Sequence, residues 1–313
     1  MSIKNNLWVE KHRPTKLEDY VWIDDSQKRE VGGWVSQGEI PHLLLSGGPG
    51  CGKTTLAKLV LREMNVDDSD VKYVNASMMT GIDAMRDLVG FCETMPIGNF
   101  RYVMLDEADR LSPQAQDSLK NMIEEYSAIC RWILTTNRPH KIFGPIHSRT
   151  QGFHVEALDR EQFITRVAKI LIMEGVDLTE ENLEILDEYV TVAYPDLRKC
   201  LNLLQQNCSD GNLRRPKGGS SSGVSEYMVN AVSLFKNGRI HEARKVICEN
   251  ATDADYEEIY KLLYRNLDWW GKDDDTKHKA IVIIANRLKD HALVADPEIA
   301  MAACLVELSM LDG

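Results

Sequence analysis

The 313-residue chain lacks several features that would place it in a membrane or outside the cell. It has no run of about 18 apolar residues, so no segment is predicted to span a bilayer. The first residues, Met1 to Asn6, lack the apolar core of a signal peptide. The seven cysteines are scattered and form no C-x-x-C pair, which argues against a zinc module and a disulfide framework. We therefore expect a protein of a reducing cytoplasm.

Positive charge is also scarce. Lys and Arg number 37 against 48 Asp and Glu, which gives a net charge of −11. This balance argues against a broad basic face that grips nucleic acid, but it allows a narrow contact made by helix N-termini and a few Lys or Arg side chains. Any DNA contact is therefore expected to be local and assembled from several subunits. The length predicts two or three domains, and a hydrophobic content of 43% is that of a soluble globular chain.

One stretch carries a strong signal. Residues 47–54 read GGPGCGKT and match G-x-x-x-x-G-K-[ST] at every fixed position. An apolar run precedes them and a helical pattern follows, which is the context in which this motif predicts a phosphate cradle. The glycines let backbone N–H groups converge on phosphates at a helix N-terminus. We expect Lys53 to reach the β- and γ-phosphates and the Thr54 hydroxyl to bind Mg²⁺, so the chain should bind ATP or GTP.

Strands and helices alternate through the first half of the chain. Strands are expected at 43–45, 71–75, 102–105 and 131–136, and helices at 26–37, 55–61, 80–92 and 112–126. This alternation predicts a parallel sheet covered on both faces, with the ligand at the carboxyl ends of the strands. The segment 7–14 fits neither a helix nor a strand. It either packs Trp8 on a core or closes over the nucleotide base, and the residues favour neither alternative.

The second half of the chain has helical patterns. These patterns cover 159–173, 179–190 and 195–208, and five more follow the Gly- and Ser-rich linker at 214–223. Within the last five, we expect two buried stripes, Ile281, Ile284 and Leu288, then Ile299, Ala303 and Val306. This last part is interpreted as an oligomerisation collar, in which Trp269-Trp270 belongs to either a core or an interface.

Two polar groups follow predicted strands beside the phosphate loop. Asp106-Glu107 ends an apolar strand, which is a Walker B arrangement downstream of the loop. Asp106 is expected to hold the Mg²⁺ shell, and Glu107 to orient and polarise the attacking water. Asn137 ends the next strand, where it either faces the γ-phosphate or caps the strand. The predicted chemistry is nucleotide hydrolysis.

Several motifs occur in the order found in DNA clamp loaders. They are Trp8–Pro14, Ile40–Leu44, the phosphate loop with Asp106–Asp109, and Ser148–Thr150. Over nearly its whole length the chain resembles a small, ATP-hydrolysing subunit of the replication factor C type, an AAA+ protein. Its short length and divergent signatures look most like a tailed-phage version, and it lacks the zinc-binding cysteines of the bacterial clamp-loader ATPases.

The resemblance implies an α/β P-loop AAA+ domain (parallel sheet with flanking helices) followed by an α-helical lid and an α-helical collar. The implied boundaries are 1–157 for the AAA+ domain, 158–213 for the lid, 214–223 for the linker and 224–313 for the collar. Residues implied at the adenine are Val9, Glu10, Lys11, His12 and Val21. Those implied at the phosphates and Mg²⁺ are Gly50, Cys51, Gly52, Lys53, Thr54, Thr55 and Asp106.

The resemblance also implies roles for three polar residues. Asn137 would be the sensor of the γ-phosphate, and Arg198 a second sensor in the lid. Arg149 would be an arginine finger that enters the ATP site of a neighbouring subunit. From the residues alone, both arginines would be surface charges. Ser148-Arg149-Thr150 departs from the family's Ser-Arg-Cys but keeps the arginine.

Contacts with DNA are expected at Gly81, Ile82, Arg86, Ser112 and Lys120, although Lys120 fits an ordinary solvated helix position equally well. Thr80 stands where related proteins often carry an arginine, so this chain lacks the charged side chain of that phosphate contact.

The leading function is an ATPase that uses ATP and Mg²⁺ to open a sliding clamp and load it onto primer–template DNA. It would work within a ring-like oligomer of several copies plus a different clamp-loader subunit, in the cytoplasm, or the host cytoplasm if phage-encoded. One rival is another AAA+ motor, such as a helicase loader or branch-migration ATPase. The helical tail lacks a winged-helix pattern, which weighs against the branch-migration motor. The other rival is a structural subunit that binds nucleotide without hydrolysis, against which the intact Lys53, Thr54, Asp106 and Glu107 weigh.

Overall fold

The first part of the chain contains a five-stranded parallel sheet. The computed structural model describes residues 7–78, 82–216, 224–291, 293–294 and 296–311. The chain divides into two compact units, Met1–Phe163 and Ile164–Gly313. The strands of the first unit are β1 (Leu43–Ser46), β2 (Val71–Asn75), β3 (Arg101–Asp106), β4 (Cys130–Thr136) and β5 (Gln151–His154). They pair in the order β2-β3-β4-β1-β5, all parallel, which confirms the predicted sheet.

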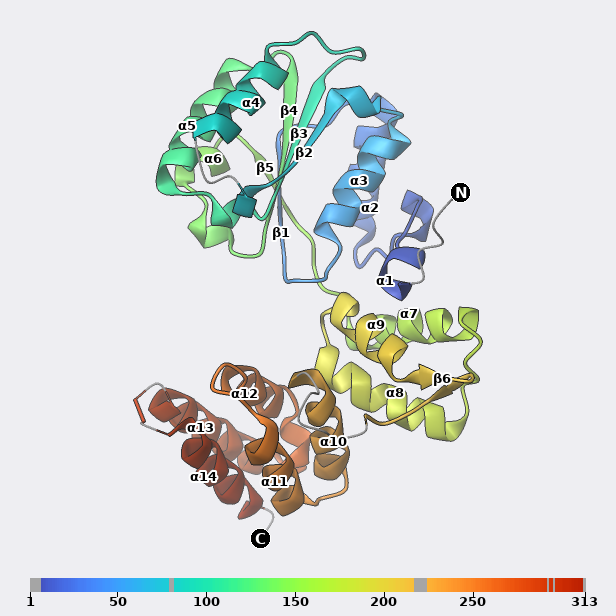
Figure 1. Cartoon of the computed structure of the whole chain (residues 1–313), viewed down its shortest axis with the longest axis vertical. Helices are drawn as coiled ribbons and strands as arrows, with labels where there is room; N and C mark the ends of the chain where they lie inside the picture. The colour runs from blue at the N-terminus through green and yellow to red at the C-terminus, as the bar shows by residue number, and fades with distance from the viewer. Residues whose placement is uncertain (1–6, 79–81, 217–223, 292, 295, 312–313) are drawn as a thin grey trace. The chain divides into compact units, whose positions relative to one another are not determined.

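Helices cover both faces of this sheet. Those of the first unit are α1 (Trp8–Lys11), α2 (Asp25–Gln37), α3 (Lys53–Glu63), α4 (Ile82–Cys92), α5 (Pro113–Glu125) and α6 (Gly144–His147). Helices α2 and α3 lie on one face, and α4, α5 and α6 on the other (Figure 1). Because side chains alternate along a strand, Leu43 and Leu45 pack with α2 and α3, whereas Leu44 packs with α4 and α5. The central strands are therefore apolar on both sides.

Local signals in the sequence explain where two of these helices begin and end. The carboxylate of Asp24 accepts a hydrogen bond from the Ser26 N–H and caps α2, which ends at Gly38 in the left-handed region (φ 66°). Ser112 caps α5 in the same way, with Pro113 in the first turn, as the sequence predicts. These caps satisfy backbone groups that the helix itself leaves without partners.

The sequence analysis missed three elements of the first unit, namely β5, α1 and the single-turn helix α6. Strand β5 reads QGFH, and only Phe153 is buried, because this strand lies at the edge of the sheet and pairs with β1 alone. Its polar residues hide the strand pattern. The segment at 7–14, expected to form no regular element, contains the single-turn helix α1, which is too short to show a helical period.

A buried ion pair fixes the loop between α4 and β3. Asp70 is 1% exposed, lies 3.2 Å from Arg101 Nη1, and accepts hydrogen bonds from the N–H groups of Ile97 and Gly98. Arg101 in turn donates to the carbonyl oxygens of Ser69, Thr94 and Met95. A buried pair of charges is tolerated when such additional hydrogen bonds satisfy both partners. The loop is therefore held in place while the side chains of Met95 and Ile97 remain exposed.

The second unit is mainly helical. The chain enters it along α7 (Arg160–Met173), and the following helices are α8 (Glu180–Ala193), α9 (Leu197–Gln206), α10 (Val224–Lys236), α11 (Ile240–Asn250), α12 (Tyr256–Arg265), α13 (Asp274–His291) and α14 (Pro297–Ser309). The five helical patterns expected after the linker are α10 to α14. In the described part of the chain, no helix combines the length and the apolar character needed to cross a bilayer.

Two details between α9 and α10 were not predicted. Strands β6 (Cys208–Ser209) and β7 (Asn212–Leu213) form a small antiparallel hairpin around Asp210-Gly211, both at positive φ. Asp-Gly is a recognised hairpin signal, so the sequence contained it. The start of the expected linker is anchored, because Arg215 makes two hydrogen bonds to the buried carboxylate of Glu188. Residues 217–223 lie outside the described residues, and the division into lid, linker and collar stays a prediction.

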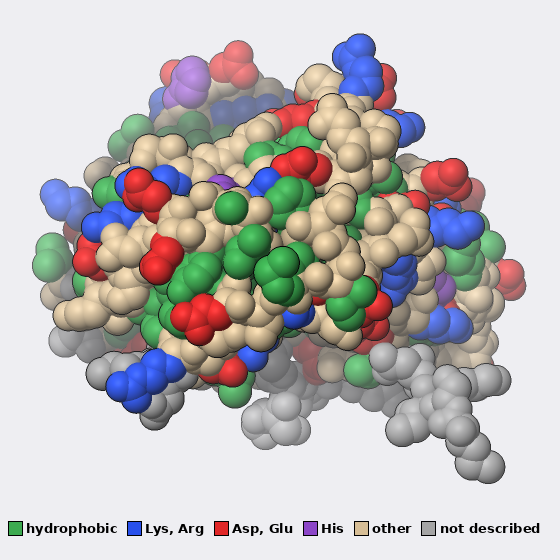
Figure 2. Space-filling model, turned by 90° about the horizontal axis from the view of Figure 1, so that it is seen from above, with side chains coloured by type: hydrophobic (Ala, Val, Ile, Leu, Met, Phe, Trp, Pro, Cys, Tyr) green, Lys and Arg blue, Asp and Glu red, His purple; other side chains and the backbone are tan. Residues whose placement is uncertain are grey.

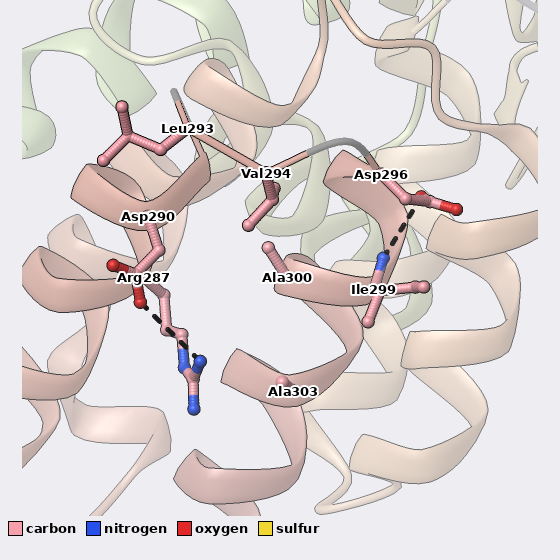
Figure 3. A pocket seen from close by; sticks show the side chains of 8 residues that line it. All are labelled: Arg287, Asp290, Leu293, Val294, Asp296, Ile299, Ala300 and Ala303. Atoms are coloured by element: carbon pink, nitrogen blue, oxygen red, sulfur yellow. Dashed lines mark hydrogen bonds and ion pairs between the residues drawn. The ribbon is translucent and has the colours of Figure 1, made fainter.

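Packing in the second unit shows that Trp269 and Trp270 belong to a core, and it corrects the predicted burial of Ile299. Trp270 is 1% exposed and Trp269 stacks on Phe235, so both belong to the helical core. Ile299, expected to be buried, is 68% exposed, because α14 buries Ala300, Met301, Cys304, Leu305 and Leu308 instead. Ile299 and Ala303 line a surface pocket with α13 residues such as Arg287 and Asp290 (Figure 3). The periodicity alone did not distinguish these two faces of α14.

Candidate active site

The phosphate loop connects β1 to α3, and its conformation requires glycine at two positions. Gly47 has φ 152°, and a Cβ there would lie 2.3 Å from the carbonyl oxygen of Val155. Gly52 has φ 97°, and a Cβ there would come within 3.3 Å of the Tyr20 ring. Positive φ and these close approaches both exclude larger residues. The first turn of α3, which begins at Lys53, therefore follows a loop in which backbone atoms can approach a bound phosphate closely.

Lys53 lies at the centre of a network of polar contacts. Its ammonium group donates to the carbonyl oxygens of Gly47 (3.1 Å) and Gly48 (2.7 Å) and to Asn137 Oδ1 (2.7 Å). The residue is 8% exposed, so these bonds replace water around a buried charge. Lys53 and Asn137, separated by 84 positions, thus meet where β1 and β4 end side by side.

The Walker B residues form the second half of the site. Asp106 Oδ1 accepts hydrogen bonds from Thr54 Oγ1 (2.9 Å) and from Thr135 Oγ1 (2.5 Å). The Glu107 N–H donates to Thr135 Oγ1 (3.2 Å), and Glu107 has φ 56° in the left-handed region. Such a backbone is uncommon for a residue other than glycine and is frequent at functional sites. The carboxylate of Glu107 is partly exposed, with Arg110 Nε 3.8 Å away.

Two residues of this network were missed by the sequence analysis. Thr135 is 1% exposed and joins Asp106 to Glu107. Asp109 accepts hydrogen bonds from the Thr136 hydroxyl and the Asn137 N–H, so it fixes the end of β4. A usable signal was the pair of polar residues after the apolar run 132–134, because parallel neighbouring strands end at the same edge.

The N-terminal segment packs against the phosphate loop and its helix. The Leu17 N–H donates to the Glu63 carboxylate, and Arg62 donates to the Thr15 carbonyl oxygen; Glu63 and Arg62 are both on α3. Tyr20 lies against Gly52, and its burial raises the pKa of its hydroxyl. Trp8 is buried, while Val9, His12 and Val21 are half-buried and Glu10 and Lys11 are exposed. The segment is therefore packed on the core beside the loop, and its expected contacts with adenine stay predictions.

The residues at the ends of β1, β3 and β4 fit Mg²⁺ and nucleotide phosphates. Thr54 and Asp106 offer a hydroxyl and a carboxylate oxygen within hydrogen-bond distance of each other. Mg²⁺ prefers oxygen ligands and usually takes only one or two carboxylates, together with water and substrate phosphates. Among the described residues, no group of three or more His, Cys, Asp and Glu side chains forms an all-protein metal site.

Arg149 and Arg198 are not part of this network. Arg149 follows α6 and contacts Glu124, Pro145 and Ser148, and within the described residues it makes no hydrogen bond to Lys53 or Asp106. Arg198 belongs to the second unit, where it is exposed in the first turn of α9. Their roles as finger and sensor stay predictions.

The expected DNA contacts are only partly described. Gly81 lies outside the described residues, and Ile82 begins α4 without a described side chain. Arg86 is exposed on α4, Ser112 uses its hydroxyl to cap α5, and Lys120 donates to Asp117 (2.7 Å). Figure 2 shows acidic and basic side chains interspersed on one face, without a continuous basic area.

Comparisons with known proteins agree with this architecture. The family model described as "ATPase family associated with various cellular activities (AAA)" matches residues 43–156, which include β1, the phosphate loop and the Walker B strand. The Replication factor C small subunit of Methanococcus vannielii is 32% identical over 269 residues, which cover 84% of this chain and 80% of the relative. The chain belongs to the replication factor C small subunit family.

Other members of the replication factor C small subunit family give the same result. That of Archaeoglobus fulgidus is 38% identical over 213 residues, covering 66% of this chain and 65% of the relative. That of Methanocella arvoryzae is 30% identical over 282 residues, which cover 87% of this chain and 86% of the relative. The chain is thus an AAA+ ATPase of the clamp-loader type, as its motifs indicate.

Solved structures are similar in fold alone. The Holliday junction branch migration motor RuvB of Thermotoga maritima has a TM-score of 0.51 at 18% identity, over 62% of this chain and 65% of that one. A point mutant of the same protein has a TM-score of 0.52 at 17% identity, over 63% and 66%. At such identity, the likeness supports the AAA+ fold but does not transfer the branch-migration activity.

Proposed function

We propose that this chain hydrolyses ATP, with Mg²⁺, as one subunit of an oligomer that opens a sliding clamp and loads it onto primer–template DNA. The observation that carries the proposal is the network joining Lys53 to Asn137 and Thr54 to Asp106, with Glu107 next to it. It brings together, from three strand ends, the residue types that phosphoryl transfer to water requires. Family membership supplies the clamp-loading context.

Each residue of the network has a proposed task. Lys53 would exchange the carbonyl oxygens of Gly47 and Gly48 for β- and γ-phosphate oxygens, which carry full negative charge. Asn137 would move with it, and its side-chain amide would then donate to the γ-phosphate. Glu107 would accept a hydrogen bond from the attacking water and hold it in line with the bond that breaks. Catalysis here is mainly positioning and charge stabilisation.

Thr54 and Asp106 are the residues that would hold Mg²⁺, and Thr135 would keep the Asp106 carboxylate oriented toward it. When bound, the ion neutralises charge on the β- and γ-phosphate oxygens. Val9, Glu10, Lys11, His12 and Val21 would surround the adenine, on a segment that packs beside the loop. Gly50, Cys51, Gly52 and Thr55 would donate backbone N–H groups to the phosphates. Arg198 would reach the phosphates from the lid.

Arg149 is proposed to complete the ATP site of a neighbouring subunit. Its side chain is 31% exposed and lies outside the network of its own chain, so it is available to another chain. A guanidinium beside the γ-phosphate contributes roughly 10³–10⁵ in rate in related enzymes. The hydrolysis site is then complete only in the oligomer.

The proposed DNA contacts include helix N-termini at α4 and α5, with Arg86, Ser112 and Lys120 nearby on these helices. Because the chain carries a net charge of −11, we propose that several subunits build this surface together.

The proposed location is the cytoplasm, consistent with seven free cysteines.

The experiment that tests this function measures ATP hydrolysis and clamp loading by the reconstituted complex. Rates are compared for ATP alone, with primed DNA, with the clamp, and with both, together with fluorescence transfer between labelled clamp and labelled DNA. The proposal predicts the highest rate and a stable clamp–DNA signal only when both are present. A rate that is indifferent to both, or stimulated equally by Holliday junctions, would favour another AAA+ motor. An absent rate with intact ATP binding would favour a structural subunit.

A further inference from the structure

Arg149 is held by a carboxylate from another element of the same unit. Its Nε and Nη2 both donate to Glu124 Oε2, at 3.2 and 2.8 Å. Glu124 lies near the C-terminal end of α5, whereas Arg149 lies between α6 and β5. The guanidinium lowers the pKa of the Glu124 carboxyl through these hydrogen bonds and its charge, so Glu124 is ionised at neutral pH.

The elements that carry the two residues are fixed to each other. Gln116 on α5 is 3% exposed, accepts a hydrogen bond from the Phe143 N–H (2.8 Å) and donates to the Lys141 carbonyl oxygen (3.1 Å). The backbone at Arg149 is also fixed, because its N–H donates to the carbonyl oxygen of Ile146, a fully buried residue. With both backbones held, the contact with Glu124 selects one conformation of a long and flexible side chain.

The hydrogen bonds of Arg149 leave part of the guanidinium available. A guanidinium has five N–H donors. Two donate to Glu124 and one donates to the Pro145 carbonyl oxygen (2.9 Å), while the contact from Nη1 to Ser148 Oγ is long at 3.4 Å. The remaining Nη2 donor has no partner among the described residues. The group can therefore keep its contact with Glu124 and still donate to a phosphate oxygen of another chain.

We propose that Glu124 is a positioning residue, which holds the Arg149 guanidinium in the orientation that completes the ATP site of the neighbouring subunit. This inference rests on the proposed role of Arg149 as a finger. Glu124 touches neither ATP nor the attacking water; it acts through Arg149. Because the pair is exposed on the surface, its contribution to stability is small, and its loss is expected to change kinetics rather than folding.

The test compares the reconstituted complex carrying wild-type chain, Glu124→Gln, Glu124→Asp or Glu125→Gln, with ATP as substrate. Glu125→Gln is the matched control, since Glu125 is exposed at the end of α5, carries the same charge one position away, and has a carboxylate with no hydrogen bond or ion pair to the described side chains. We expect Glu124→Gln to lower kcat about tenfold with KM for ATP unchanged, because misplacing a catalytic group costs up to about a hundredfold. Glu124→Asp, which keeps the carboxylate, should have a kcat between those of Glu124→Gln and wild type. Glu125→Gln should have the wild-type kcat.

A double variant separates positioning from a structural effect. Arg149→Ala should abolish most turnover, and adding Glu124→Gln should lower it no further, since Glu124 acts only through Arg149. Equal kcat values for Glu124→Gln and Glu125→Gln, beside an inactive Arg149→Ala, would overturn this inference and leave the proposed function standing. A faster Glu124→Gln enzyme would overturn it too, since Glu124 would then restrain the finger. Full turnover by Arg149→Ala would instead overturn the finger role itself.

Discussion

Thr135 gives the sharpest test of how the Walker B residues are held. Thr135→Val preserves the shape of the side chain but removes the hydroxyl that donates to Asp106 and accepts from the Glu107 N–H. The side chain is 1% exposed, so water cannot replace these bonds. A buried group left without its partner costs about 1–3 kcal/mol, and here one partner is a carboxylate. We expect a loss of about 2 kcal/mol in unfolding free energy.

The same substitution should lower ATP turnover at least about tenfold, because both Asp106 and Glu107 lose a positioning contact. Urea denaturation measures the stability, and steady-state hydrolysis by the reconstituted complex measures the turnover. Thr135→Ser is the control, because it keeps the hydroxyl and loses only a methyl group, worth about 1 kcal/mol. If Thr135→Val matched Thr135→Ser in both stability and turnover, the hydroxyl would not organise the site.

Three further predictions address catalysis, pH and DNA. Glu107→Gln should leave ATP affinity, measured by equilibrium binding, largely intact and cut ATP turnover about a hundredfold or more. Near-wild-type turnover would contradict the role of Glu107 in orienting the attacking water. Burial, and then the charge of Arg131, lower the pKa of His42 from 6.5 to about 4, and the Trp132 N–H donates to its ring. Between these two values His42 binds fewer protons in the folded than in the unfolded state. Its contribution to the unfolding free energy should therefore be fully present above about pH 6.5 and be lost as the pH falls toward 4. We expect a loss of about 1–2 kcal/mol there, discounted because the ring is partly exposed; in urea titrations, a pH dependence of His42→Gln equal to that of wild type would contradict this. The isolated chain should bind duplex DNA weakly at physiological salt and gain affinity on ATP-driven assembly; tight binding without nucleotide in a salt-controlled titration would exclude this.

The sequence predicted the centre of the site because its signals are local. The spacing of Gly47, Gly52, Lys53 and Thr54 is contained within eight residues, and Asp106-Glu107 follows an apolar strand directly. Alternation of strands and helices then predicted a parallel sheet, whose geometry brings Asn137 to the same edge. The hydrogen bond between Lys53 and Asn137 agrees with that expectation.

Contacts between distant elements could not be predicted in the same way. Thr135 on β4 donates to Asp106 on the neighbouring strand β3, 29 positions away, and Arg149 donates to Glu124, 25 positions away. The first contact follows only once β3 and β4 are known to be neighbours, and the second depends on how α5 and α6 pack, which no periodicity in the sequence indicates. Strand β5 was missed because an edge strand can carry polar residues. The exposed Ile299 on α14 shows the converse, that an apolar residue at helical spacing can face solvent.

Mixing two inactive variants tests the central claim, an ATP site shared between subunits, most directly. One variant carries Lys53→Ala and can supply only Arg149; the other carries Arg149→Ala and can supply only a phosphate loop. Complexes are reconstituted from each variant alone and from equal mixtures, and verified mixed oligomers are assayed for ATP hydrolysis. We predict that each variant alone is nearly inactive and that mixtures recover a fraction of the wild-type rate, from sites that join an intact loop to an intact Arg149. No recovery in verified mixed oligomers would mean that Arg149 serves its own chain, which would contradict the shared site.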